Sequence, residues 1–373
     1  MTAAGRFGTF FVPGPTEVRR EVLEAMSGPM IPHRSADFEA LFAGAQVGLR
    51  EIFQTKRPVM ITASSATGLM ESALRCFPPG RVLCLVNGAF SQRFSIISEA
   101  CGHESERYEV AWGEVHDPER VRELLGKGKF AAVTVVHSET STGARNPIRE
   151  ISDAAHEAGA KCLIDSVSGA AGMELRFDDW NLDFVLTGSQ KAVALPPGLA
   201  FAVASEEFIA DAKRAPARGV YFDVVELDNF AKQNQTPSTP AVSLFYAMRE
   251  QLAHIRAQGI ETRWANHAAM AKMTEEWSDN LARECGDTLT NIVAKGARSQ
   301  TVSTLRLPEG WSTALFLSGV AKLGFTVASG YGKLRDTTIR IGHMGDHTVE
   351  TLKPCLDACA EVLRETARAS RVK

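Results

Sequence analysis

Two charged residues at the ends of apolar segments could form a Schiff-base site. Asp165 ends the apolar run 161–165, and Lys191 lies 26 residues further on (191 − 165 = 26), after the apolar run 183–187. A carboxylate at the end of a buried strand needs a partner, and a protonated heterocyclic nitrogen is a suitable one. A desolvated lysine amine can form a Schiff base with a carbonyl cofactor. Each residue alone has a simpler interpretation, since Asp165 could cap a turn and Lys191 could extend from a strand end into solvent.

Two helix starts could bind an anion. The segment 64–68 (Ser-Ser-Ala-Thr-Gly) follows an apolar run, and its small residues would let backbone N–H groups and the helix dipole approach a phosphate. The spacing of a P-loop is absent, and an ordinary cap at Thr67 is the alternative. Thr239 and Pro240 predict a second helix start over 241–249, with Thr239 as the cap and Pro240 as the first helical residue. A plain cap is also possible there.

Two further segments carry polar side chains suited to a ligand. Residues 137–143 follow the most apolar run and supply an imidazole, a carboxylate and several hydroxyls, although a solvated turn has a similar composition. Arg340 occurs in the alternating pattern 338–342, and its planar guanidinium matches a carboxylate with two hydrogen bonds. A surface ion pair is the alternative for Arg340.

The elements that would position these residues alternate along the chain. Short apolar runs predict strands buried on both faces, as in a mostly parallel sheet with helices on both sides. These runs are 59–63, 82–86, 131–137, 161–165, 183–187 and 200–204. The helical patterns between them cover 67–77, 89–101, 117–126 and 148–158. Polar residues at the carboxyl ends of such strands gather at one edge of the sheet, where ligands bind.

The second part of the chain has a different pattern. Long helical periodicities over 242–257 and 260–284 precede short strand patterns and a closing helix over 347–367. The strand patterns lie at 301–306 and 337–341. We therefore expect a large α/β domain over 16–255 and a smaller α+β domain over 256–373 that also includes 1–15.

Composition and charge exclude several classes of protein. The net charge of −3 comes with scattered basic residues, so we expect no nucleic-acid partner. No apolar run approaches the ~20 residues that span a bilayer, and the N-terminal residues do not resemble a signal peptide, so we expect no membrane partner. Seven cysteines without a C-x-x-C pair favour neither a disulfide framework nor a metal site. A cytoplasmic location is the simplest expectation.

Taken in order, the motifs resemble those of one family. They are Pro-Gly-Pro-Thr at 13–16, Ser-Ala-Thr at 65–67, the segment 137–143, Asp-Ser-Val at 165–167, Gly-Ser-Gln-Lys at 188–191, Pro-Pro-Gly at 196–198 and Arg-Ile-Gly at 340–342. The series resembles the class V aminotransferases of the fold-type-I pyridoxal-phosphate superfamily, in the alanine–glyoxylate and serine–pyruvate branch. The resemblance runs almost end to end and implies that fold, with pyridoxal 5′-phosphate as the cofactor.

The resemblance also implies a role for individual residues. Lys191 would carry the cofactor and move protons, and Asp165 would lie under the pyridine nitrogen. The other residues implied to hold the cofactor are Thr140 beside the ring oxygen, Phe90 stacked on the ring, and Ser65, Ala66, Thr67 and Gln190 at the phosphate. Thr239 and Thr236 would contact the phosphate of the neighbouring subunit, although Thr236 stands where some relatives have tyrosine. Arg340, with the backbone near Gly14, would hold the substrate carboxylate.

The implied reaction is a transamination in two half-reactions through a Lys191 aldimine. The substrates would be a small amino acid (alanine or serine) and a small 2-oxo acid (glyoxylate or pyruvate), in a homodimer with shared active sites. A 2-aminoethylphosphonate transaminase, a class V lyase and a non-catalytic binding protein stay open as alternatives. A desulfurase needs a cysteine on a mobile loop, whereas Cys355 and Cys359 fall in a helical pattern.

Overall fold

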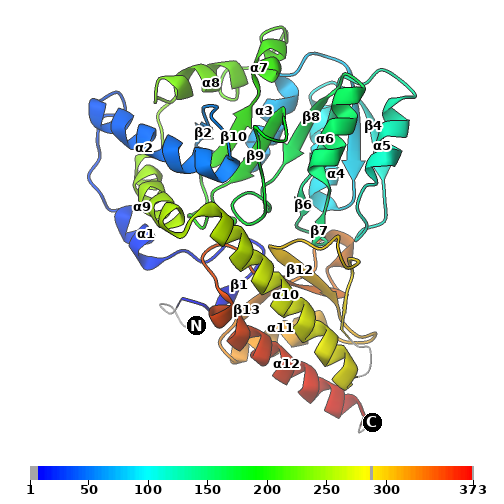
Figure 1. The fold of residues 1–373 in the computed structure, drawn as a ribbon. Helices are drawn as coiled ribbons and strands as arrows, with labels where there is room; N and C mark the ends of the chain where they lie inside the picture. Colours follow the sequence, from blue (N-terminus) through cyan, green and yellow to red (C-terminus); the bar gives the residue numbers. More distant parts are fainter. Residues whose placement is uncertain (1–6, 286–288, 372–373) are drawn as a thin grey trace.

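A seven-stranded sheet forms the centre of the larger part of the molecule (Figure 1), which we call the large lobe. The computed structural model describes residues 7–285 and 289–371. The strand order is β2-β10-β9-β8-β5-β3-β4. The strands are β2 (Met60–Thr62), β10 (Ala200–Ala204), β9 (Phe184–Gly188), β8 (Lys161–Asp165), β5 (Ala132–Val136), β3 (Arg81–Val86) and β4 (Glu104–Glu109). Neighbours from β9 to β4 are parallel, whereas β10 runs antiparallel to both β9 and β2. The predicted mostly parallel sheet is confirmed.

Helices cover both faces of this sheet, which explains why its inner strands are apolar at most positions. Along β3, Leu83 and Leu85 enter the core shared with α2 (Ala36–Phe53), whereas Val82 and Cys84 enter the core on the opposite face. The other helices of the lobe are α1 (Arg20–Ala25), α3 (Ala66–Arg75), α4 (Ala89–Ala100), α5 (Pro118–Leu125), α6 (Ile148–Glu157), α7 (Glu206–Ala212), α8 (Val224–Lys232) and α9 (Val242–Gln258). The sequence patterns did not indicate α1, α2, α7, α8 or the polar edge strand β4.

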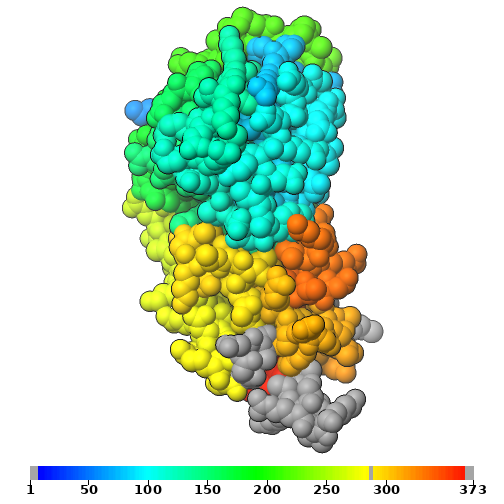
Figure 2. All heavy atoms as spheres, turned by 90° about the vertical axis from the view of Figure 1, so that its right-hand side faces the viewer, coloured from blue at the N-terminus to red at the C-terminus, as the bar shows by residue number. Residues whose placement is uncertain are grey.

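A five-stranded sheet organises the second part, the small lobe, which meets the large lobe along a broad boundary (Figure 2). Its order is β1 (Phe10–Phe11), β13 (Thr326–Ser329), β14 (Thr338–Gly342), β12 (Val302–Arg306) and β11 (Thr290–Asn291). Its helices are α10 (Ile260–Cys285), α11 (Thr313–Lys322) and α12 (Val349–Arg371), with a short 3₁₀ helix η1 (Gly332–Leu334) before β14. The N-terminal strand β1 pairs with β13 in this sheet.

The chain passes between the lobes at Gly259, where α9 ends and α10 begins. The predicted domain boundary at 255/256 stays a prediction. Residues 1–6, 286–288 and 372–373, all within the predicted small domain, lie outside the described residues. Across the described ranges, no helix has the length and apolar composition needed to cross a membrane.

The predicted start of the helix after Pro240 is wrong. The helix α9 begins at Val242, and its N-cap is Ala241, which makes no side-chain capping bond. Val242 N donates to Pro240 O in a tight turn (3.0 Å), so Pro240 lies before the helix and Thr239 cannot cap it. The alternative cap at Thr67 is also wrong, because α3 begins at Ala66 with Ser65 at the N-cap.

Candidate active site

The polar segments after three neighbouring strands meet at the carboxyl edge of the large sheet. Asp165 is the last residue of β8 and pairs with Val136 of β5 on one side and Leu186 of β9 on the other. The next residue of the β5 chain, His137, donates its N–H to Asp165 O at 2.8 Å. Lys191 follows β9 by three residues (191 − 188 = 3). The parallel register therefore brings together residues far apart in sequence.

Asp165 is a buried carboxylate that forms no ion pair with any cation in the described part of the chain. It is 3% exposed, and its Oδ1 accepts a hydrogen bond from Val167 N at 2.8 Å. No other hydrogen bond or ion pair from the described ranges, 7–285 and 289–371, reaches this carboxylate. Burial raises the pKa of Asp165 to about 7, with a further rise from Glu139, while Val167 N–H, Lys191 and Arg93 oppose it. A buried anion in this state would be stabilised by a cation placed against it.

Lys191 lies at the same edge and is equally enclosed. Its Nζ donates to Pro13 O, and the side chain is 7% exposed. Burial lowers the pKa of Lys191 to about 8, and Arg340 lowers it further, against the opposite effect of Asp165. Gly14 leaves the room for this amine: a Cβ at Gly14 would lie 2.6 Å from Lys191 Cδ, and its φ of +102° is one that glycine favours.

The backbone around Lys191 is held by hydrogen bonds from distant segments. Thr16 donates its N–H to Gln190 O (2.9 Å) and its Oγ1 to Lys191 O (3.1 Å). Arg263 of α10 donates Nη2 to Ala192 O (2.6 Å) and Nη1 to Asp346 (2.9 Å), six residues after Arg340 (346 − 340 = 6). No sequence pattern singled out Arg263, whose 1% exposure is unusual for an arginine.

Glu139 supports the site by holding the start of α4. Its side chain is fully buried and accepts from Ser91 N (2.9 Å), Phe90 N (3.3 Å) and Ser141 Oγ (2.6 Å). It therefore caps the start of α4, where Phe90 lies, and a carboxylate at a helix N-terminus is stabilised by the helix dipole. The neighbouring Thr140 makes a contact of 2.5 Å between its Oγ1 and Ser168 Oγ.

The predicted phosphate residues gather at the start of α3. Ser65 is the N-cap, and its side chain accepts no capping bond, which leaves the first N–H groups of the helix without that partner. Gln190 reaches the same region: a Cβ at Gly188 would lie 2.8 Å from Gln190 Oε1 and 3.4 Å from the Cβ of Ala66. Thr67 is half-buried in the first turn.

Arg340 extends from β14 across the boundary between the lobes. Its Nε donates to Ser329 O (2.9 Å) and its Nη1 to Thr140 O (3.2 Å). Burial lowers the pKa of Arg340 to about 10, and no carboxylate within the described part of the chain pairs with it. This guanidinium therefore has donors and charge available for an anion, close enough to Lys191 to lower its pKa.

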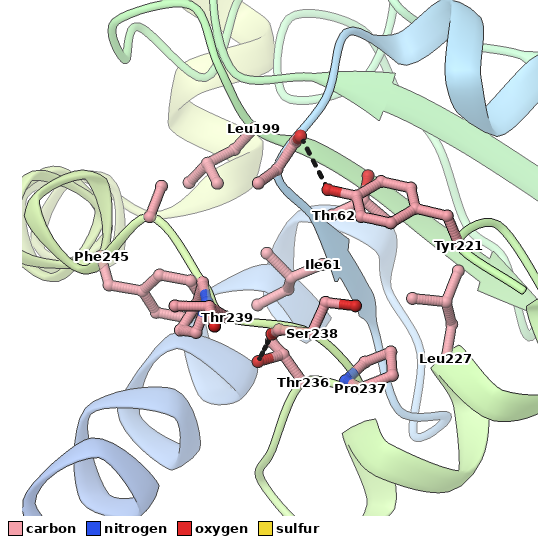
Figure 3. A pocket seen from close by; sticks show the side chains of 13 residues that line it. Ile61, Thr62, Leu199, Tyr221, Leu227, Thr236, Pro237, Ser238, Thr239 and Phe245 are labelled. Carbon is pink, nitrogen blue, oxygen red and sulfur yellow. Dashed lines mark hydrogen bonds between the residues drawn. The ribbon is translucent and has the colours of Figure 1, made fainter. Parts of the chain in front are cut away.

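Thr236 and Thr239 line a pocket that does not include Asp165 or Lys191 (Figure 3). The pocket is formed by the end of β2, by Tyr221 and by the segment that leads into α9. Thr236 Oγ1 donates to Ser238 O (2.7 Å), and Thr239 is exposed. Neither threonine forms a hydrogen bond with Lys191 within the described residues, and their predicted contact with the phosphate of a neighbouring subunit stays a prediction.

The site fits pyridoxal 5′-phosphate on three observations. A buried carboxylate without a cation, an amine with a lowered pKa and a helix N-terminus without a side-chain cap match the ring nitrogen, the aldehyde and the phosphate of that cofactor. Arg340, which pairs with no carboxylate of the described residues, matches a substrate carboxylate. Within the ranges that the structure describes, no group of histidine, cysteine and acidic side chains could hold a metal ion.

Comparison with known proteins assigns the family. Residues 10–307 match the model of the class-V aminotransferases, and the chain belongs to that family. It is 37% identical to an uncharacterized aminotransferase of Methanocaldococcus jannaschii, over 90% of this chain and 87% of the relative. It is 30% identical to L-aspartate–glyoxylate aminotransferase of Paracoccus denitrificans, over 91% and 86%.

A solved structure gives the same result for the fold. Alanine–glyoxylate aminotransferase from Nostoc sp. superposes with a TM-score of 0.88 at 27% identity, covering 95% of each chain. The chain is therefore an aminotransferase that depends on pyridoxal 5′-phosphate, with the fold-type-I architecture expected from its sequence. Cys355 and Cys359 are buried in α12, which is unlike the loop cysteine that a desulfurase requires.

Proposed function

We propose that this aminotransferase moves an amino group between a small amino acid, alanine or serine, and a small 2-oxo acid, glyoxylate or pyruvate. The observation that carries the proposal is the arrangement of three buried charged groups that have no ion-pair partner among the described residues. Asp165 and Lys191 lie at one edge of the large sheet, and Arg340 reaches toward them from β14. A cofactor bonded to Lys191 and a monocarboxylate substrate on Arg340 would satisfy all three. The Nostoc and Paracoccus relatives both use glyoxylate, which supports that acceptor.

Each residue then has a distinct task. The bound cofactor supplies a ring that withdraws electrons from the substrate α-carbon. Asp165 holds a proton on the ring nitrogen, because an ionised buried carboxylate is stabilised by that charge. Lys191, with a pKa of about 8, can exchange a proton at Nζ at neutral pH, so it would take the proton from the substrate α-carbon as a base and donate it to the cofactor carbon as an acid. Arg340 fixes the carboxylate and thereby the orientation of the α-carbon.

The same proposal includes the assembly. Ser65, Ala66, Thr67 and Gln190 would bind the phosphate from their own subunit, whereas Thr236 and Thr239 would reach the phosphate of the other subunit in a homodimer. The position of both threonines in a separate pocket supports this arrangement. The proposed location is the cytoplasm.

Half-reactions with single donors test the proposal. Purified holoenzyme is mixed with alanine, serine, aspartate or 2-aminoethylphosphonate, and the conversion of cofactor is followed by absorbance, with Lys191→Ala as the inactive control. We expect conversion with alanine or serine, reversed by glyoxylate or pyruvate, as a ping-pong mechanism requires. Conversion by aspartate or 2-aminoethylphosphonate alone would contradict the proposed substrates, and no conversion by any donor would favour a binding protein.

A further inference from the structure

Tyr331 lies between two groups that the proposed function places on opposite sides of the substrate. It belongs to the small-lobe segment between β13 and η1. Its ring centroid is 5.3 Å from that of Phe90, with an interplanar angle of 30°, and Arg340 Cζ lies 5.4 Å from the same Tyr331 ring. Tyr331 therefore touches both the residue expected to stack on the cofactor and the residue expected to hold the carboxylate.

The large lobe holds the Tyr331 ring from a second direction. Arg93 of α4 has its Cζ 4.9 Å from the Phe90 ring, and its Nη2 lies 3.5 Å from the Tyr331 hydroxyl. Within residues 7–285 and 289–371, no carboxylate pairs with Arg93. Guanidinium groups stack favourably on aromatic faces, so the two arginines and two rings form a defined cluster.

A separate contact anchors the segment that carries Tyr331. A Cβ at Gly332 would lie 2.9 Å from Trp112 Cη2, and Lys333 Nζ lies 4.6 Å from the Trp112 ring centroid. The segment thus rests on the large lobe at two places, one at Phe90 and one at Trp112. Only the first of these lies beside the candidate active site.

We propose that Tyr331 is a specificity-determining residue whose ring limits the length of the substrate side chain. The inference rests on the proposed function. A substrate that joins the cofactor at Phe90 to Arg340 must lie beside the Tyr331 ring, because that ring contacts both residues. A longer side chain has to displace the ring and break its contacts with Phe90 and Arg93. One methylene in such a pocket changes binding by about 10–200-fold.

Amino acids that cannot react test this role independently of turnover. 2-Methylalanine, isovaline and 2-methylleucine carry the same amine and carboxylate, lack an α-hydrogen and increase in side-chain length. Their dissociation constants are measured by calorimetry on the holoenzyme of the wild type and of Tyr331→Ala, Tyr331→Phe and Trp112→Ala. The wild type should bind the longest ligand at least ~10-fold more weakly than the shortest.

The ratio of the dissociation constant of the longest ligand to that of the shortest separates a loss of length discrimination from a general loss of affinity. Tyr331→Ala should abolish or reverse the dependence on length, whereas Tyr331→Phe, which keeps the ring, and Trp112→Ala, which loses only the second anchor, should keep it. An unchanged ratio in Tyr331→Ala, or an equal loss of affinity for all three ligands, would overturn the inference. If Tyr331→Ala fails to fold, Tyr331→Val is subject to the same criteria. A failure of the proposed function would instead appear as wild-type holoenzyme that converts neither alanine nor serine.

Discussion

Replacing Asp165 with asparagine should stabilise the cofactor-free protein at pH 8, although it removes a group on which the proposed chemistry depends. The folded-state pKa of about 7 lies above the ordinary value of 3.8 because the carboxyl is buried. The folded protein therefore favours the protonated form. The buried carboxyl therefore does not destabilise the folded protein below pH 3.8, where it is protonated in both states. Its destabilising effect grows as the pH rises and is complete above pH 7.

The size of the effect follows from the same pKa values. A shift of 3.2 (7 − 3.8) corresponds to about 4 kcal/mol of destabilisation at pH 8, at 1.36 kcal/mol for each pH unit. At pH 5.5 the folded carboxyl is mostly protonated and the penalty falls to about 2 kcal/mol. Asparagine is close to the same shape, keeps an oxygen for Val167 N–H and carries no charge at either pH.

Urea denaturation of the apo proteins at fixed concentration, at pH 8 and pH 5.5, measures the difference. Asp346→Asn is the matched control. Burial alone would raise the pKa of Asp346, but Arg263 and Arg19 lower it below the ordinary value, so this substitution should destabilise. A gain from Asp165→Asn that is equal at the two pH values, or a loss at pH 8, would refute the reasoning.

Two other substitutions probe substrate binding and its support. Arg340→Ala should raise KM for carboxylate substrates about 30-fold or more, the scale of losing one partner of a buried charge pair, with a smaller change in kcat; an unchanged KM would count against the clamp. Arg263→Met should lower the free energy of unfolding by about 3 kcal/mol and also raise KM, because Asp346 loses a cation and Ala192 O loses its donor. Arg57→Met removes a comparable contact to the buried Asp228 far from Lys191, so it should destabilise without that rise in KM.

The sequence was informative where burial dictates residue type. Strands such as β3 and β8 are apolar at consecutive positions because helices cover both faces of the sheet. The same logic could not reveal the direction of β10, since Ala200–Ala204 is as apolar as its parallel neighbours. It also missed β4, whose residues Glu104–Glu109 are largely polar because the strand lies at the sheet edge.

The residues of the candidate site also fall into those that the sequence could indicate and those that it could not. Asp165 and Lys191 could be chosen because Asp165 ends an apolar run and Lys191 closely follows one, and the structure brings them to one edge. Arg263 and Tyr331 could not be chosen, because their positions depend on how the small lobe packs against the large one. Glu139 stood out as part of a polar segment, but only the fold reveals that it caps α4.

The central claim is that the amine of Lys191 carries the cofactor. Reduction of the holoenzyme with borohydride, proteolysis and peptide mass spectrometry locate the attached group directly. We predict a pyridoxyl group with its phosphate on Lys191 and on no other lysine. A stoichiometric adduct on a different lysine, or a cofactor-saturated enzyme without any adduct, would contradict the account.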